Sequence, residues 1–143
     1  MFKVVPFEEI HAEPLIREEI NKDTPREFFE GHLTELKQNT MSYTFMVGDD
    51  IVAVGGIAKL WEGRGYIWLI FSEKLKKHPV AAYRGMKAFL KKQPYRRLEL
   101  DTPTNRRFDD RRARFMGFKL ECPFAKSYYP NGEDRALYSW VRE

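Results

Sequence analysis

Between residues 66 and 118 the chain alternates strand, helix, strand and helix patterns, and this order constrains its fold more than any other feature. Residues 66–71 form an apolar, aromatic-rich run typical of a buried strand. A basic stretch follows, and then apolar residues recur at helical spacing across residues 79–92 until Pro94 ends the helix. A second strand pattern covers residues 95–100. The segment predicts a protein of mixed helices and strands.

The preceding residues predict two acid-rich helices and a meander of three strands. Pro14 predicts a break or a restart in the first helix, and Asp23-Thr24-Pro25 predicts a capped start of the second. Gly48-Asp49-Asp50 is a hairpin turn between two strand patterns. The expected strands cover residues 1–6, 41–47, 51–58, 66–71, 95–100, 118–122 and 136–141, and the expected helices cover 7–21, 25–38, 79–92 and 105–116.

Composition indicates one globular domain over residues 1–143, with 43% hydrophobic and 15% aromatic residues. Cys122 is the single cysteine, so neither a disulfide within the chain nor a cysteine cluster for zinc is expected. His11 and His32 have no partner at metal-ligand spacing, and no metal site is expected. No apolar run is long enough for a transmembrane helix, and residues 1–6 lack a signal-peptide layout. A cytoplasmic protein without membrane contact is the expectation.

Positive charge is concentrated in one part of the chain. Residues 74–114 hold 14 Lys or Arg and 4 Asp or Glu, a balance of +10, whereas the rest of the chain carries −6. Such a surface suits a phosphate-rich ligand, and it equally suits nucleic acid. A solvated helix face is the third interpretation of the same charge run.

The order of elements resembles that of the GNAT (GCN5-related) N-acetyltransferases over essentially the whole chain. The resemblance implies an α+β fold with a mixed, mostly antiparallel seven-stranded sheet flanked by helices, in the order β-α-α-β-β-β-α-β-α-β-β. It implies acetyl-CoA as co-substrate and direct attack by an amine. A looser similarity to GNAT-like proteins of tailed phages covers mainly residues 68–105.

The family holds the CoA pyrophosphate on an arm that usually reads Arg/Gln-x-x-Gly-x-Gly/Ala, and Lys76-Lys77-His78-Pro79-Val80-Ala81 is its best match here. Pro79 stands where the first glycine usually stands and has no N–H to donate. The resemblance assigns cofactor contacts to Lys76, Lys77, His78, Val80 and Ala81. It also assigns them to Leu69, Ile70 and Phe71, where this strand is expected to splay from residues 95–100 and pair with the pantetheine arm.

Two other interpretations of this region stay open. Arg84-Gly85 is a rival register for the arm, but it leaves only 20 residues before Asn105. An ordinary amphipathic helix with a basic start also fits the pattern. Gly85 costs about 1 kcal/mol in a helix relative to Ala, which predicts close packing at that position.

The second family signature is an asparagine after the next strand and a helix that ends in Gly-Phe. Asn105 and Gly117-Phe118 match it, and the resemblance implies that Asn105 contacts the cofactor. A helix N-cap is an equally open role for Asn105, and Gly117 is expected to end the helix. The family's tyrosine, a general acid for the departing thiolate, corresponds to Ala113.

Transfer to an ammonium needs a base, and Glu99 and Asp101 are the candidate catalytic residues, with Glu73 as a further one. Surface or capping roles are open for each of these carboxylates. Tyr66 and Trp68 are candidates for the cleft wall or for packing. His78 has a suitable intrinsic pKa but falls in the phosphate arm.

Three functions are compatible with these patterns. The first is an acetyl-CoA-dependent N-acetyltransferase acting on a small amine or a lysine, with the acid-rich helices of residues 7–38 attracting a cationic acceptor. The second is a non-catalytic GNAT-like structural or interaction protein, of a phage virion or of a homodimer. The third, a nucleic-acid binder, is the least favoured because the sequence shows no stacking platform.

Overall fold

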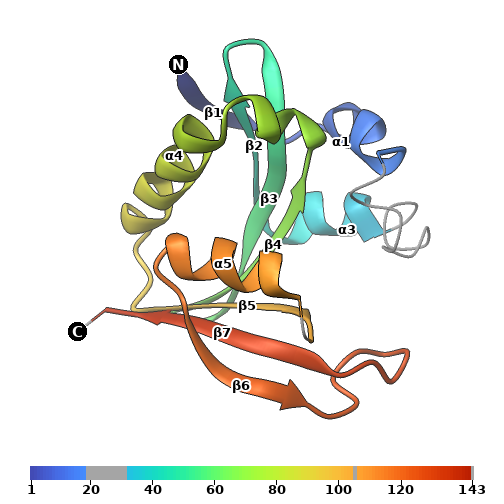
Figure 1. Cartoon of the computed structure of the whole chain (residues 1–143), viewed down its shortest axis with the longest axis vertical. Coiled ribbons are helices and arrows are strands. Elements are labelled where there is room, and N and C mark those ends of the chain that lie inside the picture. Colours follow the sequence, from blue (N-terminus) through green and yellow to red (C-terminus); the bar gives the residue numbers. More distant parts are fainter. Residues whose placement is uncertain (19–31, 105, 143) are drawn as a thin grey trace. The chain divides into compact units, whose positions relative to one another are not determined.

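The computed structural model describes residues 1–18, 32–104 and 106–142 (Figure 1). Its described elements follow the predicted order, with a 3-10 turn added between the fourth strand and the helix after it. The predicted helix start at Asp23-Thr24-Pro25 lies outside the described residues. The strands are β1 Phe2–Pro6, β2 Met41–Val47, β3 Asp50–Trp61, β4 Arg64–Phe71, β5 Arg97–Pro103, β6 Lys119–Ala125 and β7 Arg135–Val141. The helices are α1 Glu9–Ile16, α3 His32–Asn39, α4 Pro79–Lys91 and α5 Arg107–Phe115, and the 3-10 turn is η2 Glu73–Lys77.

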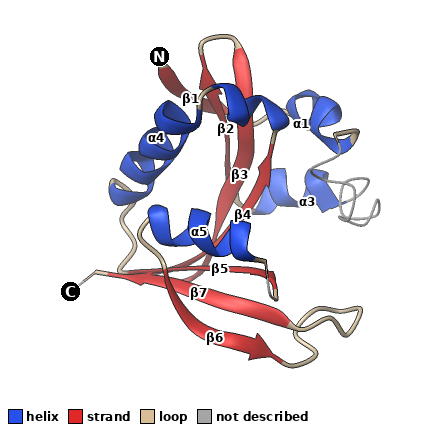
Figure 2. Cartoon of the chain, viewed as in Figure 1, coloured by secondary structure: helices blue, strands red, loops and turns tan. Residues whose placement is uncertain are grey.

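The strands form one mixed seven-stranded sheet in the order β1-β2-β3-β4-β5-β7-β6 (Figure 2). Strand β2 pairs antiparallel with β1 and β3, β7 pairs antiparallel with β5 and β6, and β4 pairs with β5 in parallel. That parallel pairing joins Arg64–Tyr66 to Arg97–Glu99. The predicted α+β architecture with a mostly antiparallel sheet is therefore confirmed.

The chain gathers into two compact units. Unit 1 comprises Met1–Ala58 and Ile67–Phe89, and unit 2 comprises Lys59–Tyr66 and Leu90–Glu143. The expectation of a single domain over residues 1–143 remains a prediction.

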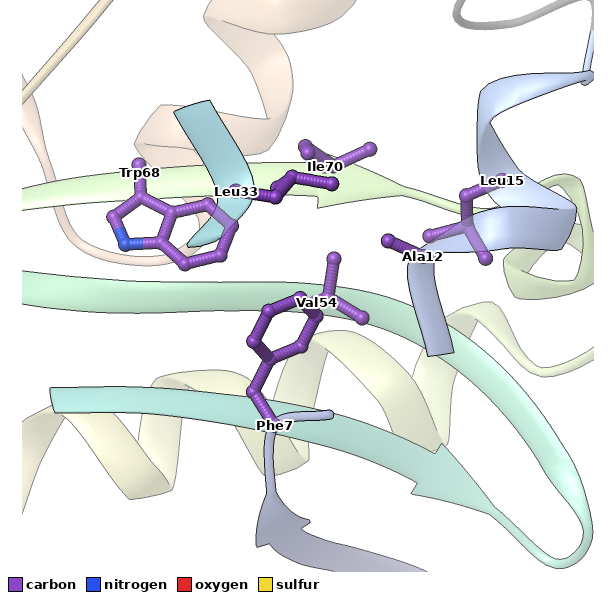
Figure 3. Close-up of a cluster of buried hydrophobic side chains, with 7 residues drawn as sticks. All are labelled: Phe7, Ala12, Leu15, Leu33, Val54, Trp68 and Ile70. Carbon is purple, nitrogen blue, oxygen red and sulfur yellow. The ribbon is translucent and has the colours of Figure 1, made fainter. Parts of the chain in front are cut away.

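In unit 1, α1 and α3 cover one face of the strands through a buried apolar cluster (Figure 3). The cluster consists of Phe7, Ala12, Leu15, Leu33, Val54, Trp68 and Ile70. Trp68 packs edge-on against Phe7, and its indole N–H donates to Thr40 Oγ1 at 3.2 Å. The hydrogen bond satisfies the polar edge of a ring whose remaining surface is in the core.

The other face of unit 1 is covered by α4. The ring of Phe89 lies 4.8 Å from that of Tyr43 and 5.4 Å from that of Phe45, centre to centre. Thr44 stands between Tyr43 and Phe45 in β2, and its side chain contacts His11 of α1 on the opposite face. Successive side chains of a strand point to opposite faces of the sheet. A Cβ at Gly85 would collide with the ring of Phe2, which confirms the predicted close packing at that glycine.

The predicted break at Pro14 is wrong, because α1 runs through it to Ile16. Pro14 is near the C-terminal end of a short helix, so only one backbone bond is lost. The neighbouring Leu15 is buried in the core cluster, and the Glu8 N–H at the other end donates to His11 Nδ1 at 3.1 Å. Packing and capping outweigh the missing bond.

Unit 2 is built on β5, β7 and β6, with α5 against one face of these strands. Trp140 packs edge-on against Phe118, and Met116 is buried at the C-terminal end of α5. Gly117 has φ of +102° there, which confirms its predicted role as the end of the helix. The predicted start at residue 105 is not the one found, because Arg106 is the N-cap and α5 begins at Arg107.

Two strands of unit 2 are longer than their sequence pattern predicts. β5 was expected to end at Leu100, yet it pairs with β7 as far as Pro103↔Arg135. β6 likewise extends to Ala125. Backbone pairing with a neighbouring strand continues where the hydrophobic pattern has stopped, so Asp101 lies inside the sheet and not after it.

Candidate functional site

The basic stretch after β4 folds into the 3-10 turn η2, where the sequence suggested a loop. Ser72 caps the turn, since its hydroxyl accepts a hydrogen bond from the Lys74 N–H at 3.1 Å. Leu75 is buried and anchors the turn to unit 1. The lysines of the turn remain on its exposed side, where they can meet a ligand.

An open hollow of about 560 Å³ lies beside this turn in unit 1. It is lined by Pro14, Leu15, Glu18, Ile51, Ser72, Glu73, Lys74, Lys76 and Lys77. The carboxylate of Glu18 accepts hydrogen bonds from the Ser72 hydroxyl at 3.0 Å and from the Glu73 N–H at 2.8 Å. The Glu73 N–H at the start of the turn is therefore already hydrogen-bonded. An anion in the hollow would be bound mainly by the positive charge of the lysines.

His78 is held by a partner from the β2–β3 hairpin. Its Nε2 lies 2.9 Å from Asp50 Oδ2, and Lys74 Nζ lies 3.9 Å from the other oxygen of Asp50. The hydrogen bond from His78 lowers the pKa of Asp50 below its usual value. The imidazole predicted to contact phosphate therefore also ties the turn to the hairpin.

The remaining residues of the predicted cofactor arm differ in accessibility. Val80 is exposed and Ala81 is half-buried in the first turn of α4. Ile70 belongs to the core cluster, and Leu69 and Phe71 are half-buried on β4. Leu69 lies so close to Gly55 that a Cβ there would collide with its side chain. Asn105 lies outside the described residues.

In unit 2, Glu99 lies between two arginines. Arg64 Nη2 donates to Glu99 Oε1 at 2.9 Å, and Arg97 Nε donates to Oε2 at 2.6 Å. The side chain is only 15% exposed. Hydrogen bonds from Arg64 and Arg97 lower the pKa of Glu99, so this carboxylate stays charged and is a weak base.

Asp101 is more deeply buried, at 5% exposure, and is contacted by two groups. The Tyr66 hydroxyl donates to its Oδ1, and Arg135 Nε lies 3.4 Å from its Oδ2. Burial, and then the charge of Asp101, raise the pKa of the Tyr66 phenol. The Arg135 guanidinium in turn stacks over the ring of Tyr129 at 4.1 Å. The structure thereby brings together four residues that are scattered in the sequence.

The two adjacent tyrosines of the β6–β7 loop differ in their surroundings. Tyr128 is exposed and Tyr129 is half-buried. Burial raises the pKa of both phenols. The negative charges of Asp101 and Glu99 also raise the pKa of Tyr128.

A third phenol, which the sequence analysis missed, lies against α5. The Tyr138 hydroxyl donates to Asp110 Oδ1 at 2.7 Å, and burial raises the pKa of this phenol. Ala113, one turn further along α5, is buried and contributes no acid. The alternation of β7 could have indicated that Tyr138 faces a helix, but not which helical residue it meets.

Among the residues that the structure describes, no three His, Cys, Asp or Glu side chains come together in a way that could hold a metal ion. Within the same residues, no helix combines the length and the apolar character needed to cross a bilayer.

Comparison with known proteins identifies the fold. Ard1 from Thermoplasma volcanium is similar over 99% of this chain and 98% of its own, with 16% identity and a TM-score of 0.76. An acetyltransferase from Bacillus subtilis in complex with CoA is similar over 100% of both chains, with 15% identity and a TM-score of 0.72. The ribosomal-protein-S18-alanine N-acetyltransferase of Escherichia coli is similar over 99% of this chain and 94% of its own, with 10% identity and a TM-score of 0.71.

No protein-family model and no curated protein matches the sequence. At identities this low, the similarity is one of fold. The similarity extends over nearly the full length of each protein. The predicted resemblance in the order of elements likewise covered essentially the whole chain. The chain has the fold of the GNAT acetyltransferases.

Proposed function

We propose that the protein is an acetyl-CoA-dependent N-acetyltransferase that acts on a primary amine. The observation that carries the proposal is its likeness, over the whole chain, to an acetyltransferase solved with CoA. The lysine-lined hollow beside η2 supports it, because Lys74, Lys76 and Lys77 suit a ligand with several phosphates. Acetyl-CoA would supply the acyl group as a thioester.

Lys76, Lys77, His78, Val80 and Ala81, which would hold the cofactor, lie in unit 1. The fit depends on charge, since Glu18 accepts the Glu73 N–H and Pro79 has no N–H to give. We assign the phosphates to Lys76 and Lys77, with His78, Val80 and Ala81 at the start of α4. The backbone of Leu69, Ile70 and Phe71 is assigned to the pantetheine arm, and Asn105 keeps its predicted cofactor role.

Asp101 is the favoured proton acceptor for the attacking amine. As the amine nitrogen bonds to the acyl carbon, its proton passes to the Tyr66 oxygen while Tyr66 gives its own proton to Asp101. The phenol then stays neutral throughout, which its raised pKa favours. Glu99 is the second candidate, and its two arginine partners make it the weaker base. Ala113 supplies no acid, so water returns a proton to the departing thiolate.

The acceptor is a small amine, a lysine or a polypeptide α-amine. The similar Escherichia coli enzyme is named for an alanine of a ribosomal protein, which supports the last of these. Acidic side chains of α1, such as the exposed Glu13, would favour a cationic acceptor. Glu8 contributes less, since Lys37 Nζ lies 2.7 Å from it.

Titration with acetyl-CoA tests the proposal. We expect a saturable rise in melting temperature and measurable heat at micromolar to millimolar acetyl-CoA. Release of free thiol in the presence of an amine panel would then identify the acceptor. Neither heat nor a melting shift at millimolar acetyl-CoA would contradict the enzymatic function.

A non-catalytic GNAT-like interaction protein is the second candidate, whether in a phage virion or in a homodimer. Pro79 at the first position of α4 and the buried Ala113 favour it, because each removes a group that the family uses. Saturable binding of acetyl-CoA without thiol release for any amine would support this candidate.

A further inference from the structure

Arg135 is a buried arginine at the first position of β7, where the β6–β7 loop meets the sheet. Pro103 of β5 is its neighbour across the ladder, and Asp101 pairs with Leu137, two residues further along β7. Residues two apart on a strand share a face of the sheet, so Arg135 and Asp101 are diagonal neighbours on one face. The register of β5 and β7 therefore brings a cation to the favoured proton acceptor.

The guanidinium group of Arg135 is held on several sides. Its Nε lies 3.4 Å from Asp101 Oδ2, and its Nη2 donates to the backbone oxygen of Asp101 at 3.5 Å. Its Nη1 lies 3.7 Å from Glu133 Oε1, and its central carbon lies 4.1 Å from the centre of the Tyr129 ring. The side chain is only 10% exposed. Contacts from the strand and from the loop thus fix the position of this positive charge.

The charge of Arg135 compensates the burial of Asp101. A buried, ionised carboxylate is costly unless a cation or hydrogen-bond donors face it. The Tyr66 hydroxyl donates one hydrogen bond but carries no positive charge. In the part of the chain that the structure describes, Arg135 is the cation that pairs with Asp101, whereas two other arginines of β4 and β5 pair with Glu99. Arg135 therefore favours the ionised form of Asp101, which is the form that can accept a proton.

The geometry of this pair differs from that of a neighbouring ion pair in unit 2. Arg97 donates to both oxygens of Glu121 at 2.8 Å, the short bidentate geometry of a strong ion pair. Arg135 Nε stays 3.4 Å from Asp101 Oδ2, and within the described residues neither of these two atoms has a hydrogen bond. Arg135 thus supplies charge without occupying that oxygen, which leaves Asp101 a better base than a bidentate partner would.

We propose that Arg135 is a positioning residue for the proposed reaction. It fixes the Asp101 carboxylate against the Tyr66 hydroxyl and keeps it ionised, and so sets the lowest pH at which acetyl transfer proceeds. The role rests on the proposed acetyl transfer. The titratable and charged groups around Asp101 and its partners are Tyr66 of β4, Glu99 of β5, Arg135 of β7, and Tyr128, Tyr129 and Glu133 of the β6–β7 loop.

The pH dependence of kcat at saturating acetyl-CoA tests this role, because kcat reports the ionisation of groups in the enzyme–substrate complex. The acceptor is the amine for which the parent protein releases most thiol. Arg135→Gln removes the charge, and we expect the acid limb of the profile to move upward by about one pH unit or more. Arg135→Lys keeps the charge and should restore most of the parent profile. A structural role alone would lower kcat equally at every pH.

Carbon NMR tests the same electrostatic effect without turnover. The carboxyl resonance of Asp101, identified by its loss in Asp101→Asn, should titrate at a higher pH in Arg135→Gln than in the parent protein. Arg142→Gln is the matched control, because Arg142 also lies over an aromatic ring, 5.3 Å from that of Trp140, and donates to the Leu90 carbonyl at 3.0 Å. It has no contact with Asp101, so its variant should melt at a lower temperature and keep the parent pH profile.

A second variant covers the case in which Arg135→Gln does not fold, which melting curves would show first. Glu133 is 43% exposed, so its replacement should leave the fold intact. Glu133→Gln removes a carboxylate that faces Arg135, and the acid limb should therefore move in the opposite direction, toward lower pH.

The possible failures are distinguishable. An active parent whose acid limb moves in neither Arg135→Gln nor Glu133→Gln would overturn the role of Arg135 and leave the proposed function standing. An equal shift in Arg142→Gln would also overturn it, because loss of stability would then explain the change. A parent that releases no thiol with any amine would overturn the proposed function and, with it, the role of Arg135.

Discussion

The Tyr66 phenol donates a hydrogen bond to the Asp101 carboxylate, and the two residues come from the parallel strands β4 and β5. Asp101 is almost fully buried, and its second oxygen meets Arg135 at 3.4 Å. A buried carboxylate needs such partners, because its charge is costly without them. This arrangement makes Asp101 both a structural group and the favoured proton acceptor, and mutations can separate the two roles.

Asp101→Asn keeps the shape of the side chain and removes its basicity. We expect thiol release to fall by about a hundredfold, the scale of general-base catalysis, with a smaller effect on melting temperature. Glu99→Gln should reduce the rate less, since Arg64 and Arg97 already hold Glu99 as a weak base. The exposed Glu62→Gln is the control, since Glu62 pairs with Lys59 and not with a partner of Asp101. Equal losses of rate and folding would assign both carboxylates a structural role.

Tyr66→Phe removes the hydroxyl that Asp101 accepts from. We expect the free energy of unfolding to drop by about 1–3 kcal/mol, since a buried carboxylate loses a donor. In a double-mutant cycle with Asp101→Asn in urea, the two losses should not add.

Tyr128→Phe, Tyr129→Phe and the corresponding Ala changes test whether a loop phenol supplies the acid that Ala113 does not. If none of them changes the rate, these tyrosines serve only to pack the loop.

Lys76→Glu and Lys77→Glu should weaken CoA binding more than they weaken binding of analogues lacking the adenosine phosphate. Each exposed contact should contribute about 1 kcal/mol and fade with added salt. Calorimetry at two salt concentrations measures both effects. Lys3→Glu makes the same charge change at an exposed position of β1 and should leave binding unaltered. A loss of the same size for Lys3→Glu would show a general charge effect.

Glu121 links stability to pH in unit 2. Arg97 donates to both of its oxygens at 2.8 Å, and this hydrogen bonding, with that of Ser139, lowers its pKa to about 2. A carboxyl group whose pKa is lowered by folding stabilises the folded state at pH values above its unfolded pKa of about 4.3. This stabilisation is lost as the pH falls toward the folded pKa. Urea midpoints of the parent and Glu121→Gln should therefore differ near neutrality and converge on acidification. A gap that widens below about pH 4 would contradict this assignment.

Gly85→Ala should destabilise unit 1, although Ala is the better helix former by about 1 kcal/mol. The added methyl collides with the Phe2 ring, and overpacking of this kind costs about 1–3 kcal/mol. Phe2→Ala removes the obstacle, so the double variant should recover the helix advantage of Ala relative to Phe2→Ala alone. Urea denaturation of the four proteins measures the coupling. Additive losses would show that Phe2 is not the obstacle.

Local sequence patterns predicted most of the elements because each pattern is a property of neighbouring residues. β2 has the predicted bounds, and α4 ends within one residue of its prediction. The failures occurred where a distant segment intervened. Core packing carries α1 through Pro14, and pairing with β7 extends β5 past Asp101. Hydropathy cannot report a hydrogen bond to a strand tens of residues away.

The candidate site was only partly predictable for the same reason. Lys76 and Lys77 are contiguous with a helix start, so the sequence could associate them with an anion. The partners of Asp101 could not be found in this way, because Tyr66 is 35 positions away in sequence. The exposure of Phe108 was equally hidden, since an apolar residue on a helix is compatible with the core or the surface.

By itself the sequence determined the order of helices and strands, and with it the GNAT fold, because periodicity and turn residues act over a few positions. Only the tertiary structure decided that Glu99 is neutralised by two arginines and that Asp101 is bonded to Tyr66. It also decided that Phe108 is exposed to solvent. These properties depend on which side chains meet across the sheet and on how much water remains around them, and both are set when distant segments pack together.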